Sequence, residues 1–249
     1  MARLTLRDCK EIVLGLLNAP LRRLGVELVP SWRLCWWMHP AAFEFAGRQF
    51  DYFFHPYNCG WPPYVSERSV ELSLANVWLG ALGSSGVVEI GAVTPYYWPG
   101  RVRSVIDPYD PHPLVTTRDS LFNVDLSGRS VLSISTFEHI GMGDYGIDES
   151  PEQVREALDK LLAESPRFLV TVPVGYNKIL DQWLATADSI PSDVSLRYAV
   201  RQSWSTWTGA KPGEIRSDLG DPALQRRFPG TCIGRWANSL AVLERGGII

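Results

Sequence analysis

Residues 87–93 read VVEIGAV, a short apolar run with a glycine near its end. Similar runs occur at 103–109 (RSVIDPY), 130–136 (SVLSIST) and 167–175 (RFLVTVPVG). Short apolar runs that end in polar or glycine residues are typical of buried parallel strands. Between the last two runs, the leucine spacing of residues 148–165 predicts a helix that starts near Pro151. This alternation favours a doubly wound α/β sheet.

Other segments predict a hairpin and two late strands. Residues 43–55 (FEFAGRQFDYFFH) alternate between apolar and polar side chains, which predicts a short hairpin that turns at Ala46-Gly47. Residues 196–207 and 238–245 are also typical of strands, and we expect them to form an antiparallel pair.

Helical periodicity occurs in two segments ahead of residue 87. Residues 5–18 show this periodicity, and Pro20 then stops the pattern. Residues 66–82 also show it, and they begin with Ser66, a residue type that favours the N-cap position of a helix. Residues 12–28 mix leucines with two arginines. We interpret them as a helix packed on the domain, with a helix on a membrane surface as the alternative.

Length and composition narrow the class of protein. The 249 residues fit one hydrophobic core, and a net charge of −3 from scattered residues provides no basic surface for nucleic acid. The four cysteines lie far apart without the spacing of a zinc site, so we expect reduced thiols and no metal. Without a signal peptide or an apolar run of about 20 residues, we expect a cytoplasmic protein with no membrane span.

Acidic residues occur where successive strands are expected to end. Glu89 and Gly91 end the first run, Asp107 follows Glu89 by eighteen residues, and Asp125 follows by eighteen more. Ligands of open parallel sheets bind beyond the carboxyl ends of the strands, where an acid accepts the hydroxyls of a ribose. We therefore expect Asp107 to bind a ribose and Asp125 an adenine amino group. The alternative is that these acids cap loops and form turns, Asp107-Pro108 above all.

Several of these stretches together resemble one known family. They are VVEIGAVTPYYW (87–98), VIDPYD (105–110), NVDL (123–126), SVLSISTFEHIG (130–141) and FLVTVPVGYNKILDQWL (168–184). Over about residues 45–243 the chain resembles bacterial class I S-adenosylmethionine-dependent methyltransferase-like proteins. The resemblance implies a Rossmann-like fold, with a mostly parallel seven-stranded sheet and helices on both faces. That domain would span residues 66–249, and residues 1–65 would form an aromatic-rich, helical N-terminal extension or lid.

The resemblance also implies a cofactor, S-adenosylmethionine, and the residues that hold it. Its methionine end would contact Glu89, Gly91 and Ala92. The ribose would contact Asp107 and Pro108, and the adenine Asp125 and Leu126. Ser135 and Thr136 would complete the cofactor site, next to the transferred methyl group.

One position departs from the family pattern. Methyltransferases of this kind usually carry a second glycine two residues after the first, and this chain has Val93 there. A β-branched residue resists positive φ and obstructs close approach to the backbone. The departure counts more heavily against a nicotinamide cofactor, because GxGxxG requires three glycines and the chain offers one.

His139 is the predicted general base, and the neighbouring Glu138 either orients its ring or points away from it. Histidine suits proton removal near neutral pH, and His139 follows a predicted strand where substrate and cofactor would meet. A hydrogen-bonded structural histidine is the alternative. The methyl acceptor is expected to contact polar and aromatic residues, which are His55, Tyr57, Asn58, Trp61, Arg68, Tyr176 and Asn177. The alternative for the first five is that they only pack the N-terminal layer on the sheet.

The sequence thus predicts methyl transfer to oxygen or nitrogen of a small molecule such as a sugar or secondary metabolite. Among protein partners, we expect a second copy of the chain, in a homodimer. Two alternatives remain, and Val93 favours the first of them. One is a protein that has lost methyl transfer and serves as a binding or scaffold partner, and the other is an enzyme that uses the cofactor, or another nucleotide, for different chemistry.

Overall fold

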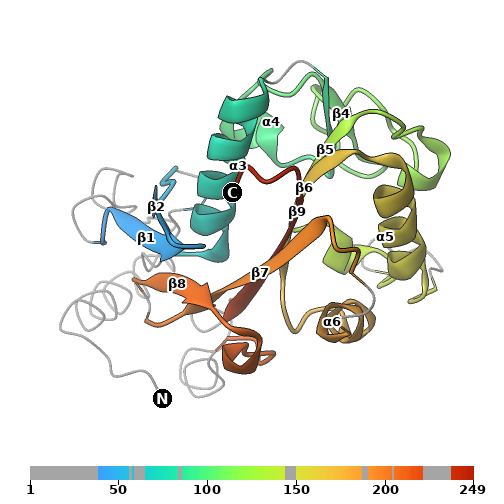
Figure 1. The fold of residues 1–249 in the computed structure, drawn as a ribbon. Coiled ribbons are helices and arrows are strands. Elements are labelled where there is room, and N and C mark those ends of the chain that lie inside the picture. Colours follow the sequence, from blue (N-terminus) through green and yellow to red (C-terminus); the bar gives the residue numbers. More distant parts are fainter. Residues whose placement is uncertain are drawn as a thin grey trace, which may run out of the picture.

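The structure is a computed structural model that describes residues 39–55, 58, 65–83, 86–143, 150–186, 190–203, 205–220 and 237–249. Within these residues one nine-stranded sheet has the order β2-β1-β8-β7-β9-β6-β5-β3-β4 (Figure 1). The predicted helix at 5–18 and the segment 12–28 lie outside the described residues.

The four apolar runs form the parallel part of the sheet. Their strands are β3 (Val87–Ile90), β4 (Ser104–Ile106), β5 (Ser130–Ile134) and β6 (Arg167–Pro173). Strand β3 pairs in parallel with β4 and β5, and β5 pairs in parallel with β6. All four residues of β3 are buried, as expected of a strand covered on both faces.

The prediction of a seven-stranded, mostly parallel Rossmann-like sheet is wrong, because most of the paired residues are antiparallel. Strand β9 (Ser239–Arg245) lies between β6 and β7 (Val194–Arg201) and runs antiparallel to both. Strand β8 (Trp207–Ala210) then pairs antiparallel with β7. The hairpin of β1 (Ala42–Phe45) and β2 (Arg48–Asp51) adds two further strands, with β1 parallel to β8.

A physical reason for this error lies in β9. Six of its seven residues are buried, and its central run Leu240–Leu243 is as apolar as that of a parallel strand, although Ser239 and Glu244 on either side are polar. An apolar run indicates burial on both faces, but it does not encode the direction in which the strand runs. The predicted antiparallel pair of late strands is nevertheless confirmed, because β7 pairs with β9 from Val194↔Arg245 to Val200↔Ser239.

The four α-helices of the described residues cover two faces of the sheet (Figure 1). They are α3 (Glu67–Leu82), α4 (Thr94–Tyr97), α5 (Gln153–Glu164) and α6 (Lys178–Ala185). Helix α3 packs with residues such as Leu132 in one core, whereas α5 and α6 pack with residues such as Val131 in the other. Because consecutive strand residues point to opposite faces, these two cores lie on opposite sides of the sheet. Ser66 precedes α3, but its side chain makes no capping hydrogen bond.

The predicted hairpin turn is confirmed at Ala46 and Gly47, which have φ values of 52° and 73°. The hairpin was assigned to the N-terminal extension, yet it belongs to the same sheet as the rest of the described chain. The N–H of Trp207 in β8 also donates a hydrogen bond of 2.7 Å to the hydroxyl of Tyr52, just beyond β2. Among the described helices, none is both long and apolar enough to cross a bilayer.

Candidate functional site

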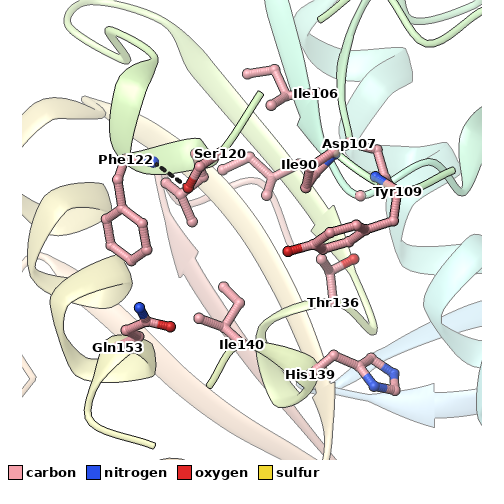
Figure 2. A pocket seen from close by; sticks show the side chains of 13 residues that line it. Ile90, Ile106, Asp107, Tyr109, Ser120, Phe122, Thr136, His139, Ile140 and Gln153 are labelled. Atoms are coloured by element: carbon pink, nitrogen blue, oxygen red, sulfur yellow. Dashed lines mark hydrogen bonds between the residues drawn. The ribbon is translucent and has the colours of Figure 1, made fainter. Parts of the chain in front are cut away.

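A pocket of about 260 Å³ lies at the carboxyl ends of β3, β4 and β5 (Figure 2). This is where ligands bind in sheets with adjacent parallel strands. Its lining residues come from the strand ends, from the loops after them and from the start of α5. They are Ile90, Gly91, Ile106, Asp107, Pro108, Tyr109, Ser120, Leu121, Phe122, Thr136, His139, Ile140 and Gln153.

Asp107 is the single carboxylate among these lining residues, and three backbone groups hold it in place. Its Oδ2 accepts a hydrogen bond of 2.9 Å from the N–H of Ala92, which links the ends of β3 and β4. Its Oδ1 accepts from the N–H groups of Tyr109 and Asp110, at 2.9 and 2.8 Å. A carboxylate fixed in this way is presented to a ligand in one orientation.

Gly91 and Thr136 meet where β3 and β5 end. Gly91 has φ +84°, and a Cβ added there would lie 2.0 Å from Thr136 Oγ1. Real Cβ atoms do not approach an oxygen so closely, so this contact requires glycine. Both the backbone angle and the close approach explain the glycine that ends the run 87–93.

Glu89 is buried, and it is not among the pocket-lining residues. One carboxylate oxygen accepts from the N–H groups of Val93 and Thr94 at 3.0 and 2.7 Å, and the other accepts from the Thr94 hydroxyl. Burial raises the pKa of Glu89 to about 7, although these hydrogen bonds act to lower it. Glu89 therefore holds the turn that follows Gly91, and the structure does not bring it to the predicted methionine end.

Val93 does not obstruct the pocket. Its backbone is in the ordinary right-handed region, with φ −103° and ψ −51°. Its side chain packs against the core on the α3 side of the sheet, whereas the pocket-lining Ile90 and Ile106 belong to the other core. The side chain of Val93 is thus accommodated away from the pocket.

Asp125 and Leu126 lie at the opposite end of the parallel strands. The N–H of Leu126 donates a 2.9 Å hydrogen bond to Glu164, the last residue of α5, and β5 starts only at Ser130. Asp125 is exposed, and it accepts from the N–H of Ser127. The amino ends of β3, β5 and β6 meet here, so Asp125 is not placed to contact an adenine in the pocket.

The sequence analysis did not identify the nearby residues that do line the pocket, Ser120, Leu121 and Phe122. They belong to the 3-10 turn Leu121–Asn123 and its N-cap Ser120, which precede Asp125 along the chain. Asp119 Oδ1 supports the turn by accepting from the N–H of Ser120 and from the side chain of Asn123. The stretch RDSLF (118–122) carried the signal, namely an acid and a capping serine before an apolar pair.

His139 lines the pocket and comes from a second 3-10 turn, Phe137–His139. Its Nε2 lies 3.7 Å from Oε1 of Glu138, whose side chain is 1% exposed. Burial, followed by the charge of Glu71, raises the pKa of Glu138 well above its usual range. The ring of Tyr176 packs edge-on against His139, with 4.8 Å between ring centroids.

Asn177 and Ser135 support this turn from outside the pocket lining. The Asn177 amide donates to the carbonyl groups of Glu138 and Ile140, both at 3.3 Å, while its oxygen caps α6. The hydroxyl of Ser135 donates to Glu71 in α3 at 2.6 Å. These two predicted contact residues therefore hold the backbone on either side of His139.

His55, Asn58 and Arg68, which were also predicted to contact the methyl acceptor, lie nearer to α3 and are not among the pocket-lining residues. Asn58 is buried, and it accepts from the N–H of His55 and donates to a carbonyl of the same loop. His55 packs edge-on against Tyr97, and burial lowers its pKa. Arg68 lies 3.5 Å from Glu71. Tyr57 and Trp61 lie outside the described residues.

No model of a known protein family matches this sequence. The curated proteins contain no significant match either. Within the part of the chain that the structure describes, no three His, Cys, Asp or Glu side chains are grouped closely enough to hold a metal ion.

Proposed function

We propose that the pocket binds the adenosyl group of S-adenosylmethionine and that the protein transfers a methyl group to oxygen or nitrogen of a small molecule. The observation that carries the proposal is Asp107, a fixed carboxylate at the end of β4 in a pocket with apolar walls. A carboxylate at this position of a parallel sheet suits the two hydroxyls of a ribose.

The charge of the lining favours a nucleoside without phosphates. None of the pocket-lining residues named above is lysine or arginine, and Asp107 is an acid. A phosphate beside Asp107 would be repelled and would find no cationic partner in this lining. An adenosyl sulfonium carries no phosphate, and its positive charge is compatible with a nearby carboxylate.

The walls suit a planar base. Phe122 and Tyr109 enter the pocket from opposite sides (Figure 2), and Leu121 and Ile140 add apolar surface. Aromatic side chains pack favourably on the face or edge of a heterocycle. Ser120 lies beside Phe122 and offers a hydroxyl to the polar edge of the base.

His139 lies at the other end of the pocket, below Thr136 in Figure 2. When bound, S-adenosylmethionine supplies an electrophilic methyl group on sulfur. His139 would take the proton that the acceptor atom releases when it receives this methyl group. Glu138, 3.7 Å from the ring, orients His139.

Calorimetry with S-adenosylmethionine and with its demethylated product tests the proposal. We expect Asp107→Ala to abolish the heat of binding, because it removes the ribose partner. Asp125→Ala is the matched control, since Asp125 is exposed at the far end of the strands and its loss should leave affinity unchanged. The absence of heat in the unsubstituted protein would refute the proposal.

One observation favours the alternative, a nucleoside-binding protein without methyl transfer. Glu89 is turned away to hold backbone groups, so the lining residues offer no second acid to the amino group of a methionine moiety. Adenosine alone distinguishes the two functions. If the methionine half is not recognised, adenosine binds as tightly as S-adenosylmethionine; an enzyme that uses the whole cofactor binds adenosine more weakly. A cytoplasmic location and a homodimer stay predictions.

A further inference from the structure

We infer that Glu71 of α3 is a positioning residue of the proposed site, which acts through Ser135 to hold the segment carrying Thr136 and His139. The inference rests on the proposed function only for the identity of the ligand. Its physical content, an ordered segment at the end of β5, is measurable without any ligand.

Glu71 reaches the ends of two neighbouring strands from inside the protein. Its side chain is fully buried, and Oε1 accepts hydrogen bonds from Ser135 at 2.6 Å and from Thr171 of β6 at 2.8 Å. Oε2 faces Arg68, one helical turn earlier, at 3.5 Å. Helix α3 is thereby fastened to the carboxyl ends of β5 and β6, behind the pocket.

Ser135 needs this support because of its backbone. Its φ is 44°, in the left-handed region that residues other than glycine rarely adopt. Such a conformation persists only where the surroundings hold it. The Glu71 hydrogen bond supplies one restraint, and the bond of 2.9 Å from the Ser135 N–H to the Thr171 carbonyl supplies another.

The turn at Ser135 determines where the next residues lie. Thr136 packs against the bare Cα of Gly91 in the pocket, and its carbonyl accepts from the N–H of His139 at 3.0 Å. If Ser135 relaxed to negative φ, the chain direction after β5 would change, and both Thr136 and His139 would move. Glu71 therefore influences the pocket without lining it.

Amide hydrogen exchange in ligand-free protein tests the inference directly. The N–H groups of His139 and Ile140 donate within this segment, to Thr136 and Phe137. We expect Glu71→Ala to speed exchange at both amides by about tenfold, because the restraint on Ser135 is lost. Glu71→Gln keeps an acceptor oxygen, and it should stay within about threefold of the unsubstituted protein.

Thr171→Val is the matched control. It removes the other hydrogen bond to Glu71 Oε1 and leaves the Ser135 bond in place. It should lower thermal stability with little effect on exchange at His139 and Ile140. Because Glu71→Ala removes the partner of the buried Thr171 hydroxyl and of the half-buried Ser135 hydroxyl and could prevent folding, Ser135→Ala provides a second test that removes only the Ser135 donor.

Calorimetry with the demethylated cofactor adds a functional readout. We expect Glu71→Ala to weaken its affinity about tenfold, and adding Ser135→Gly to restore most of it, because glycine adopts positive φ without support. A purely structural role for Glu71 would not predict this rescue. The inference fails if Glu71→Ala or Ser135→Ala leaves exchange at His139 and Ile140 no faster than Thr171→Val does. Absence of binding in the unsubstituted protein would refute the proposed function and leave the exchange result to decide the inference.

Discussion

Gly91 shows how much one residue determines at the pocket. We expect Gly91→Ala to abolish binding of the proposed cofactor and to lower the free energy of unfolding by about 1–3 kcal/mol, through the strain at φ +84° and the clash with Thr136. Gly128→Ala is the matched control, because Gly128 has φ +71° with nothing within 4 Å of an added Cβ. Gly128→Ala should lose stability through backbone strain alone, and it should bind the proposed cofactor as tightly as the unsubstituted protein does. Denaturant titration and calorimetry measure both effects.

Glu89 gives stability a dependence on pH. Its pKa is about 7 when folded and close to 4.5 when unfolded, so between these values the folded state binds more protons. Stability from this group is fully present below pH 4.5 and is lost as the pH rises towards 7. Glu89→Gln removes this contribution. A shift of one pKa unit is worth about 1.4 kcal/mol. As the pH rises from below 4.5 to above 7, the free energy of unfolding of the unsubstituted protein should therefore fall by roughly 3 kcal/mol relative to that of Glu89→Gln. Parallel pH profiles from denaturant titration would contradict this.

The sequence located part of the pocket at the level of residues. Gly91, Asp107, Pro108, Thr136 and His139 follow strand ends and do line it. Asp125 lies away from the pocket, since a fixed spacing along the chain does not tell at which end of a strand a loop residue lies. Glu89 holds the N–H groups of the turn after Gly91, a role for which an acid beside a glycine turn is equally suited.

Among the elements, the β1–β2 hairpin offers a stabilising substitution. Ala46 and Gly47 both have positive φ, which is the requirement of a type I′ turn, and asparagine is preferred over alanine at the first position. We expect Ala46→Asn to raise the free energy of unfolding by about 0.5–1 kcal/mol. Denaturant titration measures the change, with Ala46→Val as the opposite case, since a β-branched residue resists positive φ.

Elements with a distinct local period were predictable, whereas their assembly was not. The hairpin is predicted by the alternation of apolar and polar residues, and α3 by its helical periodicity. Helix α5 is predicted by the same periodicity and by Pro151, which precedes it by two residues. The positions of β7, β8 and β9 depend on pairing between residues distant in sequence, such as Phe168 with Arg245. No local pattern specifies which edge of β6 accepts which strand, or in which direction.

On the scale of the whole molecule, the sheet joins the hairpin to the remainder of the described chain. We expect one cooperative unfolding transition, with secondary-structure and tryptophan fluorescence signals that coincide. Tyr52→Phe should lower the free energy of unfolding of that single transition by about 1–3 kcal/mol, because the buried N–H of Trp207 loses its partner. A separate early transition that reports the hairpin would instead support an independent N-terminal unit.

The position of β9 has a consequence for biosynthesis. This strand fills the gap between β6 and β7, so both of those edges stay open until residue 245 has left the ribosome. Unpaired edges of apolar strands attract other chains. Nascent polypeptides that stall before this point would be substrates for chaperones, because the sheet cannot be completed without β9.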